Sequence, residues 1–170
     1  VDNGSTDGTW EWLQQFQQET NNRKDAELEV VLIRNDGNIG CSTARNQGIE
    51  AARGNTVAFI DNDIACRSRS WLDTLSSHLR NNDDAGIVGP KLVYPVPPYR
   101  IQCAGVAISP TGRVQFRGRG EAADDARFNR TEPVQCLISA CCMTTASVLA
   151  QVGGFDEAFN PVEYEDFDLV

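Results

Sequence analysis

The sequence predicts an α/β fold: a three-layer α/β/α sandwich with a mainly parallel central sheet and a small antiparallel hairpin region. Apolar, β-branched runs alternate with helical patterns over the first 90 residues. Continuous apolar strands of this kind are typical of a parallel sheet that helices cover on both faces. From about Lys91 a proline-rich stretch leads into short alternating segments, which are typical of hairpins.

The first segment, "VDNGSTDGT", has the composition of a tight turn, because glycine and short polar side chains suit its backbone. Trp10, Leu13 and Phe16 then recur at helical spacing, and Asp7 or Thr6 is expected to cap that helix. The turn also matches the first half of a calcium loop. Its twelfth position is a glutamine, where a bidentate glutamate is needed, so calcium is rejected.

The following segments alternate between strand and helix. "ELEVVLIR" (27–34) predicts a buried strand, residues 41–53 a helix with a small-residue face, and "TVAFI" (56–60) a second buried strand. An apolar stripe over 71–79 predicts a helix, and "AGIVGP" (85–90) a short third strand.

The second half has shorter elements. "IQCAGVAIS" (101–109) and "RVQFRG" (113–118), separated by "PTG", predict an antiparallel hairpin. "PVQCLISACCMTT" (133–145) predicts a further strand region, and "TASVLAQVGG" (145–154) a short helix that ends at glycine.

Composition excludes several classes of protein. A hydrophobic content of 41% over 170 residues indicates a globular chain, and no apolar run is long enough to span a membrane. No basic stripe dominates, so a nucleic-acid partner is not expected. The net charge of −9 is concentrated after residue 130, where seven acids occur without any Lys or Arg. A block of one sign that also holds four aromatics indicates a site rather than a disordered tail.

Six cysteines occur without C-x-x-C spacing, which argues against metal-ligand and thioredoxin motifs. Most lie in or beside apolar runs, where cysteine behaves as a small hydrophobic residue. Reduced thiols and a cytoplasmic protein are therefore expected.

Short acids follow the predicted strands. Asp2 stands at an apparent strand end, and Asp61 and Asp63 directly follow "TVAFI". Ligands of doubly wound sheets bind outside the carboxyl ends of the strands. Two carboxylates in one turn suit Mg²⁺ or Mn²⁺, although such pairs also cap helices.

A second acidic group, "EYEDFDL", contains Glu165 and Asp166 and follows the aromatic-rich "GGFDEAFNP". Aromatic surroundings desolvate a carboxylate and favour its use as a general base. The alternative is an acidic first helical turn, which the helix dipole favours.

The order of these motifs adds a resemblance. "VDNGSTDGT", "NIGCSTARNQGIEAARG", "VAFIDND" and "GGFDEAFNPVEYEDFDL", taken together, resemble the inverting family-2 glycosyltransferases with the nucleotide-diphospho-sugar transferase (GT-A) fold. The middle, "GPKLVYP…RIQCAG…GRVQFRGRG", resembles their rhamnosyltransferase-like branch.

The resemblance implies a role for each matching residue. Asp2 corresponds to the acid that contacts the nucleotide base, and Arg45 to a basic residue near the donor diphosphate or nucleotide. Asp61 corresponds to the acid near the donor ribose, and Asp63 to the ligand of the Mg²⁺ or Mn²⁺ ion on the diphosphate. A further pair completes the set: Asp166 corresponds to the general base, with Glu165 beside it.

It also implies partners and organisation. The partners would be a nucleotide-diphosphate sugar donor and a saccharide or lipid-linked saccharide acceptor, in cell-envelope polysaccharide biosynthesis. Residues 1–170 would form one catalytic-domain fragment, with a nucleotide-sugar-binding part (1–90) and an acceptor-side part (91–170). We expect an excerpt of a longer cytoplasmic protein that associates with the inner face of the membrane through segments outside this chain.

Three other functions remain as alternatives. A sugar nucleotidylyltransferase shares the fold but would not need Glu165 and Asp166. A haloacid-dehalogenase-like phosphatase could use Asp61 and Asp63, yet it needs a downstream lysine and none follows Lys91. A sugar-nucleotide-binding domain without turnover is the non-enzymatic alternative.

Overall fold

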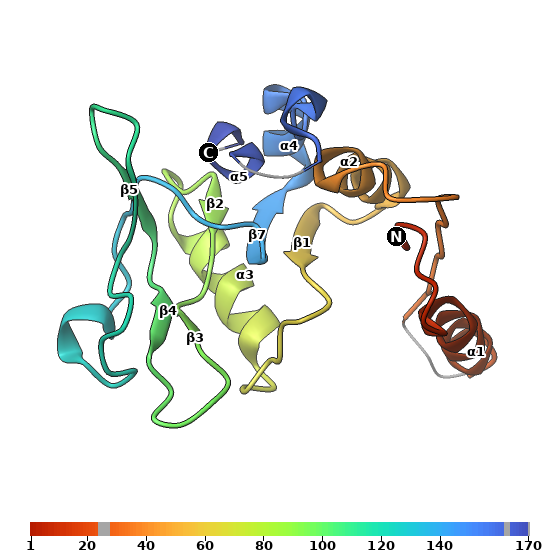
Figure 1. Ribbon diagram of the computed structural model, residues 1–170, viewed down its shortest axis with the longest axis horizontal. Helices are drawn as coiled ribbons and strands as arrows, with labels where there is room; N and C mark the ends of the chain where they lie inside the picture. The colour runs from red at the N-terminus through yellow and green to blue at the C-terminus, as the bar shows by residue number, and fades with distance from the viewer. Residues whose placement is uncertain (24–27, 162–163, 170) are drawn as a thin grey trace. The chain divides into compact units, whose positions relative to one another are not determined.

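A computed structural model describes residues 1–23, 28–161 and 164–169. These residues divide into two compact units (Figure 1). The first unit combines residues 1–53 with 154–165, and the second combines 54–153 with the residues from 166 onward. These borders differ from the functional division at residues 90 and 91, which stays a prediction.

Helix α1 (Thr9–Asn21) forms where the apolar spacing predicted it. Trp10 and Leu13 are partly buried, whereas Phe16 is exposed and stacks on Trp12, with ring centroids 5.4 Å apart. The apolar face of α1 is therefore narrower than the predicted stripe.

The start of α1 differs slightly from the expected cap. Gly8 is the N-cap residue, with φ of 89°, and Asp7 stands just before it. The Asp7 carboxylate accepts hydrogen bonds from the Thr9 amide (3.1 Å) and the Thr9 hydroxyl (2.6 Å). These bonds lower the pKa of Asp7. Asp7 thus stabilises the first turn of the helix without occupying the cap position.

Residues 28–34 do not form the predicted buried strand. They are extended, and their pairing is an isolated parallel bridge between Asp2 and Arg34. Backbone groups of Val30 instead bond side chains of α1: its carbonyl accepts from Gln17 (2.8 Å) and its amide donates to Asn21 (3.0 Å). An apolar β-branched run becomes a ladder only where a neighbouring strand supplies partners, which the periodicity of the run does not report.

Helix α2 (Cys41–Ala51) confirms the small-residue helix predicted over 41–53. Its start is held by a distant residue of the same unit. The Asn160 side chain accepts from the Ser42 amide (3.1 Å) and donates to the Thr43 hydroxyl (2.7 Å). A Cβ on Gly40, whose φ is 96°, would overlap that Asn160 side chain. The short helix η2 (Glu157–Phe159) contacts α2.

The second unit contains a three-stranded sheet in the order β1-β7-β2. Strand β1 (Thr56–Ile60) matches its predicted bounds, and β2 (Ile87–Val88) lies in the predicted third strand. The predicted burial of β1 is wrong, because Phe59 is buried whereas Ala58 and Ile60 are exposed. Strand β7 (Cys141–Thr145) is the end of the predicted region 133–145 and pairs antiparallel with both neighbours, Ala58 opposite Met143 and Val88 opposite Met143.

This arrangement differs from the predicted mainly parallel sheet. Strands β1 and β2 run in the same direction but are not neighbours, because β7 lies between them. The strand–helix–strand pattern reports only that β1 and β2 belong to one crossover unit. The pattern does not show that β7, about 50 residues further along the chain, lies between them.

Two helices contact this sheet. Helix α3 (Trp71–Asn81) packs Leu75 and Leu79 against Met143 of β7, which confirms the predicted stripe. Helix α4 (Ala146–Val152) also contacts β7. It is capped by Thr145, whose hydroxyl accepts from the Val148 amide (3.2 Å), and it ends at Gly153 with φ of 87°. A side-chain cap at the start and glycine at the end define its length.

The antiparallel region comprises two small ladders. Strand β3 (Leu92–Val93) pairs with β4 (Ile101–Cys103), and β5 (Val106–Ile108) pairs with β6 (Val114–Phe116). The second ladder confirms the predicted hairpin, but the segment 101–109, predicted as one arm of it, is divided between the two ladders. The short helix η1 (Ala126–Phe128) follows. Buried Leu92, Cys103, Val106, Cys136 and Cys141 form a common apolar core under these ladders.

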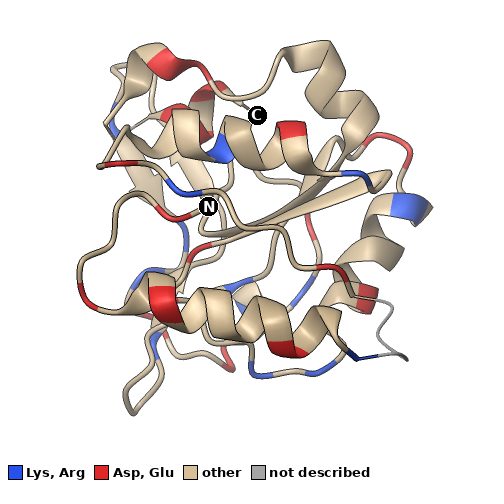
Figure 2. Ribbon diagram, turned by 90° about the vertical axis from the view of Figure 1, so that its right-hand side faces the viewer, with Lys and Arg blue, Asp and Glu red and all other residues tan. Residues whose placement is uncertain are grey.

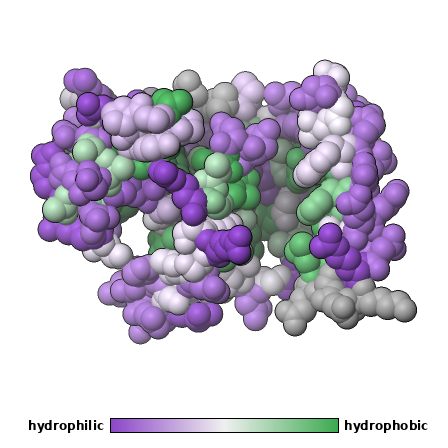
Figure 3. All heavy atoms as spheres, turned by 90° about the horizontal axis from the view of Figure 1, so that it is seen from below, coloured by the Kyte–Doolittle hydropathy of each residue, from purple (hydrophilic) through white to green (hydrophobic). Residues whose placement is uncertain are grey.

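All six cysteines are free thiols, as expected. Acidic and basic residues both occur along the helices and loops of the described chain (Figure 2). The face seen in Figure 3 is mostly hydrophilic, with hydrophobic residues showing between the polar ones. None of the helices in the described residues has the length and apolar character that crossing a bilayer requires.

Candidate functional site

Asp2 ends a short piece of parallel pairing in the first unit. Its amide donates to the Ile33 carbonyl (2.8 Å), and its carbonyl accepts from the Asn35 amide (2.9 Å). The sequence predicted Asp2 at the end of a strand, but in the structure Asp2 forms an isolated parallel bridge with Arg34 outside the strands.

The Asp2 carboxylate is buried, with the residue 4% exposed. One oxygen, Oδ1, accepts from the Ser5 amide (3.1 Å) and so closes the opening turn. The other, Oδ2, is buried without a hydrogen bond in the described structure, and the Arg34 Nε lies 3.7 Å from it. Buried carboxylate oxygens nearly always have a donor. Oδ2 is therefore a buried acceptor without a hydrogen bond, at ion-pair distance from Arg34.

Two turns pack together around Asp2. The Asn3 side chain donates to Asn38 (3.1 Å) and accepts from the Asn35 side chain (2.9 Å). A Cβ on Gly4 would lie 2.7 Å from the Gly37 Cα, so only glycine allows this approach. The opening segment therefore does more than turn the chain, because it is locked onto the segment that precedes α2.

Asp61 and Asp63 follow β1 directly in the second unit. The Asp61 amide donates to the Ala140 carbonyl (2.8 Å), and its carbonyl accepts from the Ile64 amide (3.1 Å), which closes a turn. The Asp63 side chain is exposed on that turn, and Asp61 is partly buried. The tertiary structure thus presents both acids at the carboxyl end of β1.

Asp61 and Asp63 are the two carboxylates that the sequence predicted near a metal ion. Within the described ranges, no group of three or more His, Cys, Asp or Glu side chains is placed to hold a metal ion. Burial raises the pKa of the nearby Cys141 thiol, and Cys66 and Asp61 raise it further, so Cys141 stays protonated. Asp61 and Asp63 would thus offer at most two carboxylates, which suits Mg²⁺ or Mn²⁺ completed by phosphate oxygens and water.

Asp166 is held by a serine that the sequence analysis did not single out. Ser139, only 3% exposed, donates its hydroxyl to Asp166 Oδ1. Ser139 directly precedes Ala140, the residue whose carbonyl bonds the Asp61 amide. The second unit therefore gathers Asp61 and Asp166 beside the start of β7. A single hydroxyl residue in the apolar run before a strand was the only sequence signal for Ser139.

Glu165 and Arg45 form a buried ion pair in the first unit. Their side chains are 6% and 13% exposed, and Arg45 Nη1 lies 3.2 Å from Glu165 Oε1. The guanidinium carbon of Arg45 lies 5.4 Å from the centre of the Phe155 ring. Sequence analysis placed both residues at the site but did not predict that they pair with each other.

The six predicted residues are thus shared between the units. Asp2, Arg45 and Glu165 belong to the first unit, and Asp61, Asp63 and Asp166 belong to the second. The border falls inside helix α5 (Glu165–Asp168), between its first two residues. The sequence also predicts that Asp2, Asp61, Asp63 and Asp166 line one cleft at the carboxyl end of the sheet, and this stays a prediction.

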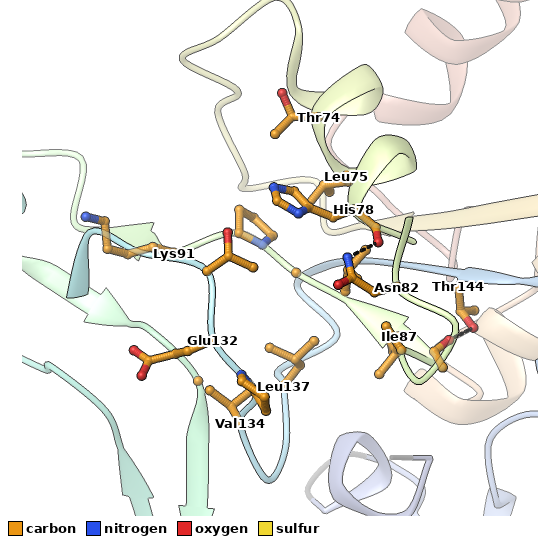
Figure 4. Close-up of a pocket in the computed structure, with 18 of the residues that line it drawn as sticks. Thr74, Leu75, His78, Asn82, Ile87, Lys91, Glu132, Val134, Leu137 and Thr144 are labelled. Carbon is orange, nitrogen blue, oxygen red and sulfur yellow. Dashed lines mark hydrogen bonds between the residues drawn. The ribbon is translucent and has the colours of Figure 1, made fainter. Parts of the chain in front are cut away.

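A large cavity of about 1100 Å³ occupies another part of the second unit. It lies between α3, β2 and the segment before β7, and Leu75, His78, Ile87, Val134 and Leu137 are among its lining residues (Figure 4). The lining includes neither Asp61 and Asp63 after β1 nor the two aspartates of α5. His78, the only histidine of the sequence, borders this cavity rather than the acidic turn.

Comparison with known proteins identifies the class. Residues 1–152 match the family model described as glycosyl transferase family 2, and the chain belongs to that family. This confirms the family to which the ordered motifs pointed, and membership implies the GT-A fold. The rhamnosyltransferase-like branch stays a prediction.

Several relatives are similar over parts of their length. An uncharacterised protein of Sinorhizobium fredii is 30% identical over 99% of this chain and 18% of its own length. The O-antigen biosynthesis protein RfbC of Myxococcus xanthus is 33% identical over 68% of the chain and 9% of its own length. A putative teichuronic acid biosynthesis glycosyltransferase of Bacillus subtilis, TuaG, is 41% identical over 37% of the chain and 22% of its own length. The chain thus matches less than a quarter of each relative.

Proposed function

We propose that this chain carries the donor-binding and base groups of an inverting glycosyltransferase. The enzyme would move a sugar from a nucleoside diphosphate to an acceptor hydroxyl with the help of Mg²⁺ or Mn²⁺. The observation that carries the proposal is the Asp2 carboxylate, buried beside the bridge to Arg34 with Oδ2 lacking a hydrogen-bond donor. An imide N–H of a uracil or thymine base would satisfy that oxygen.

The two acids after β1 are the second support. Asp61 would bond the donor ribose, and Asp63 would hold the cation against the diphosphate. When bound, that ion would neutralise charge that develops on the leaving nucleoside diphosphate. The exposed position of Asp63 on a turn leaves its oxygens accessible to an ion that substrate oxygens complete.

Asp166 is the proposed general base. Its carboxylate would accept the proton of the acceptor hydroxyl while the acceptor oxygen forms a bond to the anomeric carbon. The bond from that carbon to the diphosphate oxygen breaks, and its electron pair leaves with the nucleoside diphosphate. Attack from the face opposite the leaving group inverts the anomeric centre. The hydrogen bond from Ser139 fixes the orientation that such a base requires.

The relatives suggest the acceptor class. Two carry names from O-antigen and teichuronic acid biosynthesis. We therefore propose a saccharide or lipid-linked saccharide acceptor in cell-envelope polysaccharide assembly, with a hexosyl or deoxyhexosyl donor. The six free cysteines support a reducing, cytoplasmic setting.

The experiment that tests this function uses the full-length protein. UDP-, dTDP- and GDP-linked sugars are titrated with and without Mn²⁺, and the products of any transfer are examined by NMR for their anomeric configuration. We expect metal-dependent binding of a uridine or thymidine nucleotide sugar and transfer with inversion. Binding without transfer in the presence of an acceptor panel would indicate a binding domain. Release of pyrophosphate from a nucleoside triphosphate and a sugar phosphate would indicate a nucleotidylyltransferase.

A further inference from the structure

We propose that Arg45 and Glu165 are a positioning pair. In this view Arg45 does not contact the donor and Glu165 does not act as a second base. Together they fix the backbone at the start of α5, next to Asp166. The inference rests on the proposed function in which Asp166 is the base, and it assigns to two residues a role that the family resemblance does not give them.

The burial of both charges is the first argument. A charged side chain taken out of water is destabilising unless it is paired, and here the two side chains are 13% and 6% exposed and 3.2 Å apart. A general base takes up a proton in every turnover. If Glu165 did so, the ion pair between Glu165 and Arg45 would be broken inside the protein. A carboxylate that neutralises a buried guanidinium is poorly suited to proton transfer.

The surroundings of Arg45 are the second argument. Its guanidinium lies against the Phe155 ring as well as Glu165, which restricts it from two sides. To reach a donor diphosphate the side chain would have to leave both contacts. The neighbouring Asn46 also ties this part of α2 to the Phe155 backbone. Its side-chain nitrogen donates to the Phe155 carbonyl (2.9 Å), and its side-chain oxygen accepts from the Phe155 amide (2.9 Å).

The pair is the last in a row of contacts along one segment. Helix α2 holds this segment at Phe155, Asn160, Pro161 and Glu165, all within the first unit. Asn46 bonds the backbone at Phe155, the Asn160 side chain bonds the start of α2, and the Cys41 amide donates to the Pro161 carbonyl (2.9 Å). Glu165 is the final contact before the chain reaches Asp166, to which it is joined by a peptide bond. Loosening it therefore frees the residue that carries the base.

The test compares single and double variants of the full-length protein. Arg45→Met, Glu165→Gln and the double variant are measured for turnover, and for UDP and dTDP affinity with Mn²⁺ by calorimetry. A misplaced catalytic group costs about 10²-fold in rate, so we expect kcat to fall by about that factor in each single variant. Nucleotide affinity should stay within about twofold, because the lost interaction is made away from the donor. The double variant should be no slower than the slower single variant, since both remove one interaction.

Matched variants make the outcome specific. Arg53 and Glu29 form an ion pair of the same type in the same unit, 2.9 Å apart but 78% and 59% exposed. Arg53→Met/Glu29→Gln should change neither turnover nor affinity, as is usual for exposed pairs. Arg45→Lys retains a charge at the same place and should recover part of the activity. If Arg45→Met does not fold, Arg45→Lys provides the measurement of turnover and nucleotide affinity in its place.

Two results would overturn the inference. A loss of nucleotide affinity of about tenfold or more in Arg45→Met, with Glu165→Gln unchanged, would place Arg45 on the donor. Independent, additive losses of turnover in the two single variants would make Glu165 a separate catalytic group. Failure of the proposed function looks different, because the unmodified protein would then bind no nucleotide and transfer no sugar. In that case, non-additive changes in the free energy of unfolding of the variants would still show that Arg45 and Glu165 interact.

Discussion

Replacing Asp166 by asparagine separates catalysis from structure most cleanly. Asparagine keeps the shape of the side chain and can still accept the hydrogen bond from Ser139. It cannot take up the proton of an acceptor hydroxyl. We therefore expect turnover to fall steeply while donor binding and folding are largely retained.

The expected magnitudes can be set against each other. Removal of a general base costs about 10²–10⁴-fold in rate, or about 3–5 kcal/mol in the activation barrier. The structural cost is smaller. The bond from Ser139 changes from a charged to a neutral acceptor, a loss of about 1 kcal/mol in the free energy of unfolding. Helix α5 has only four residues, so the helix-dipole contribution of its acids is also small.

The assay measures three quantities on the same Asp166→Asn full-length protein. Turnover is followed with the donor and acceptor identified by the nucleotide-sugar screen, nucleotide affinity by calorimetry with Mn²⁺, and thermal stability by circular dichroism. Ser139→Ala is the companion variant. It should lower kcat by less than Asp166→Asn does, because the base is retained but loses one of the groups that orient it. An Asp166→Asn protein that is destabilised but fully active would refute the assignment of Asp166 as the base.

Three further predictions follow from the geometry. Asp63→Asn should weaken nucleotide binding in the presence of Mn²⁺ and leave binding without metal unchanged; equal affinities of variant and parent under both conditions would restrict Asp63 to a role in the turn. At pH 8 iodoacetamide should modify exposed Cys66 in the folded protein, whereas Cys103, whose pKa burial raises, should react only on unfolding, which peptide mass spectrometry can follow. Hydrogen bonding to Arg117 lowers the pKa of Glu132. Because a carboxyl with a depressed folded-state pKa stabilises above its unfolded value of about 4.3, the stability advantage over Glu132→Gln should be present at pH 7 and lost as the pH falls below about 4. Urea unfolding at several pH values measures it, and a pH-independent difference would contradict it.

The local sequence pattern was enough to predict the elements that have clear apolar spacing or clear end signals. The helix α3, the bounds of strand β1 and the glycine end of helix α4 all formed as predicted. These features depend on residues within a few positions of one another, so the sequence contains all the information. The acids after β1 could be assigned to a strand end for the same reason. The order of the motifs along the chain was likewise sufficient to indicate the family that comparison confirmed.

The tertiary structure decided what depends on partners far apart in sequence. Strand β7 lies between β1 and β2, residues 28–34 bond side chains of α1 instead of a ladder, and Asn160 caps α2 across more than 100 residues. Arg45 bonds Glu165, which is 120 positions away in the sequence. Periodicity reports which side of an element is buried but not what buries it, and a hydrogen bond or an ion pair requires a specific partner at a specific distance. For that reason the sequence named the residues of the candidate site, and only the fold showed that Ser139 holds Asp166 and that Arg45 holds Glu165.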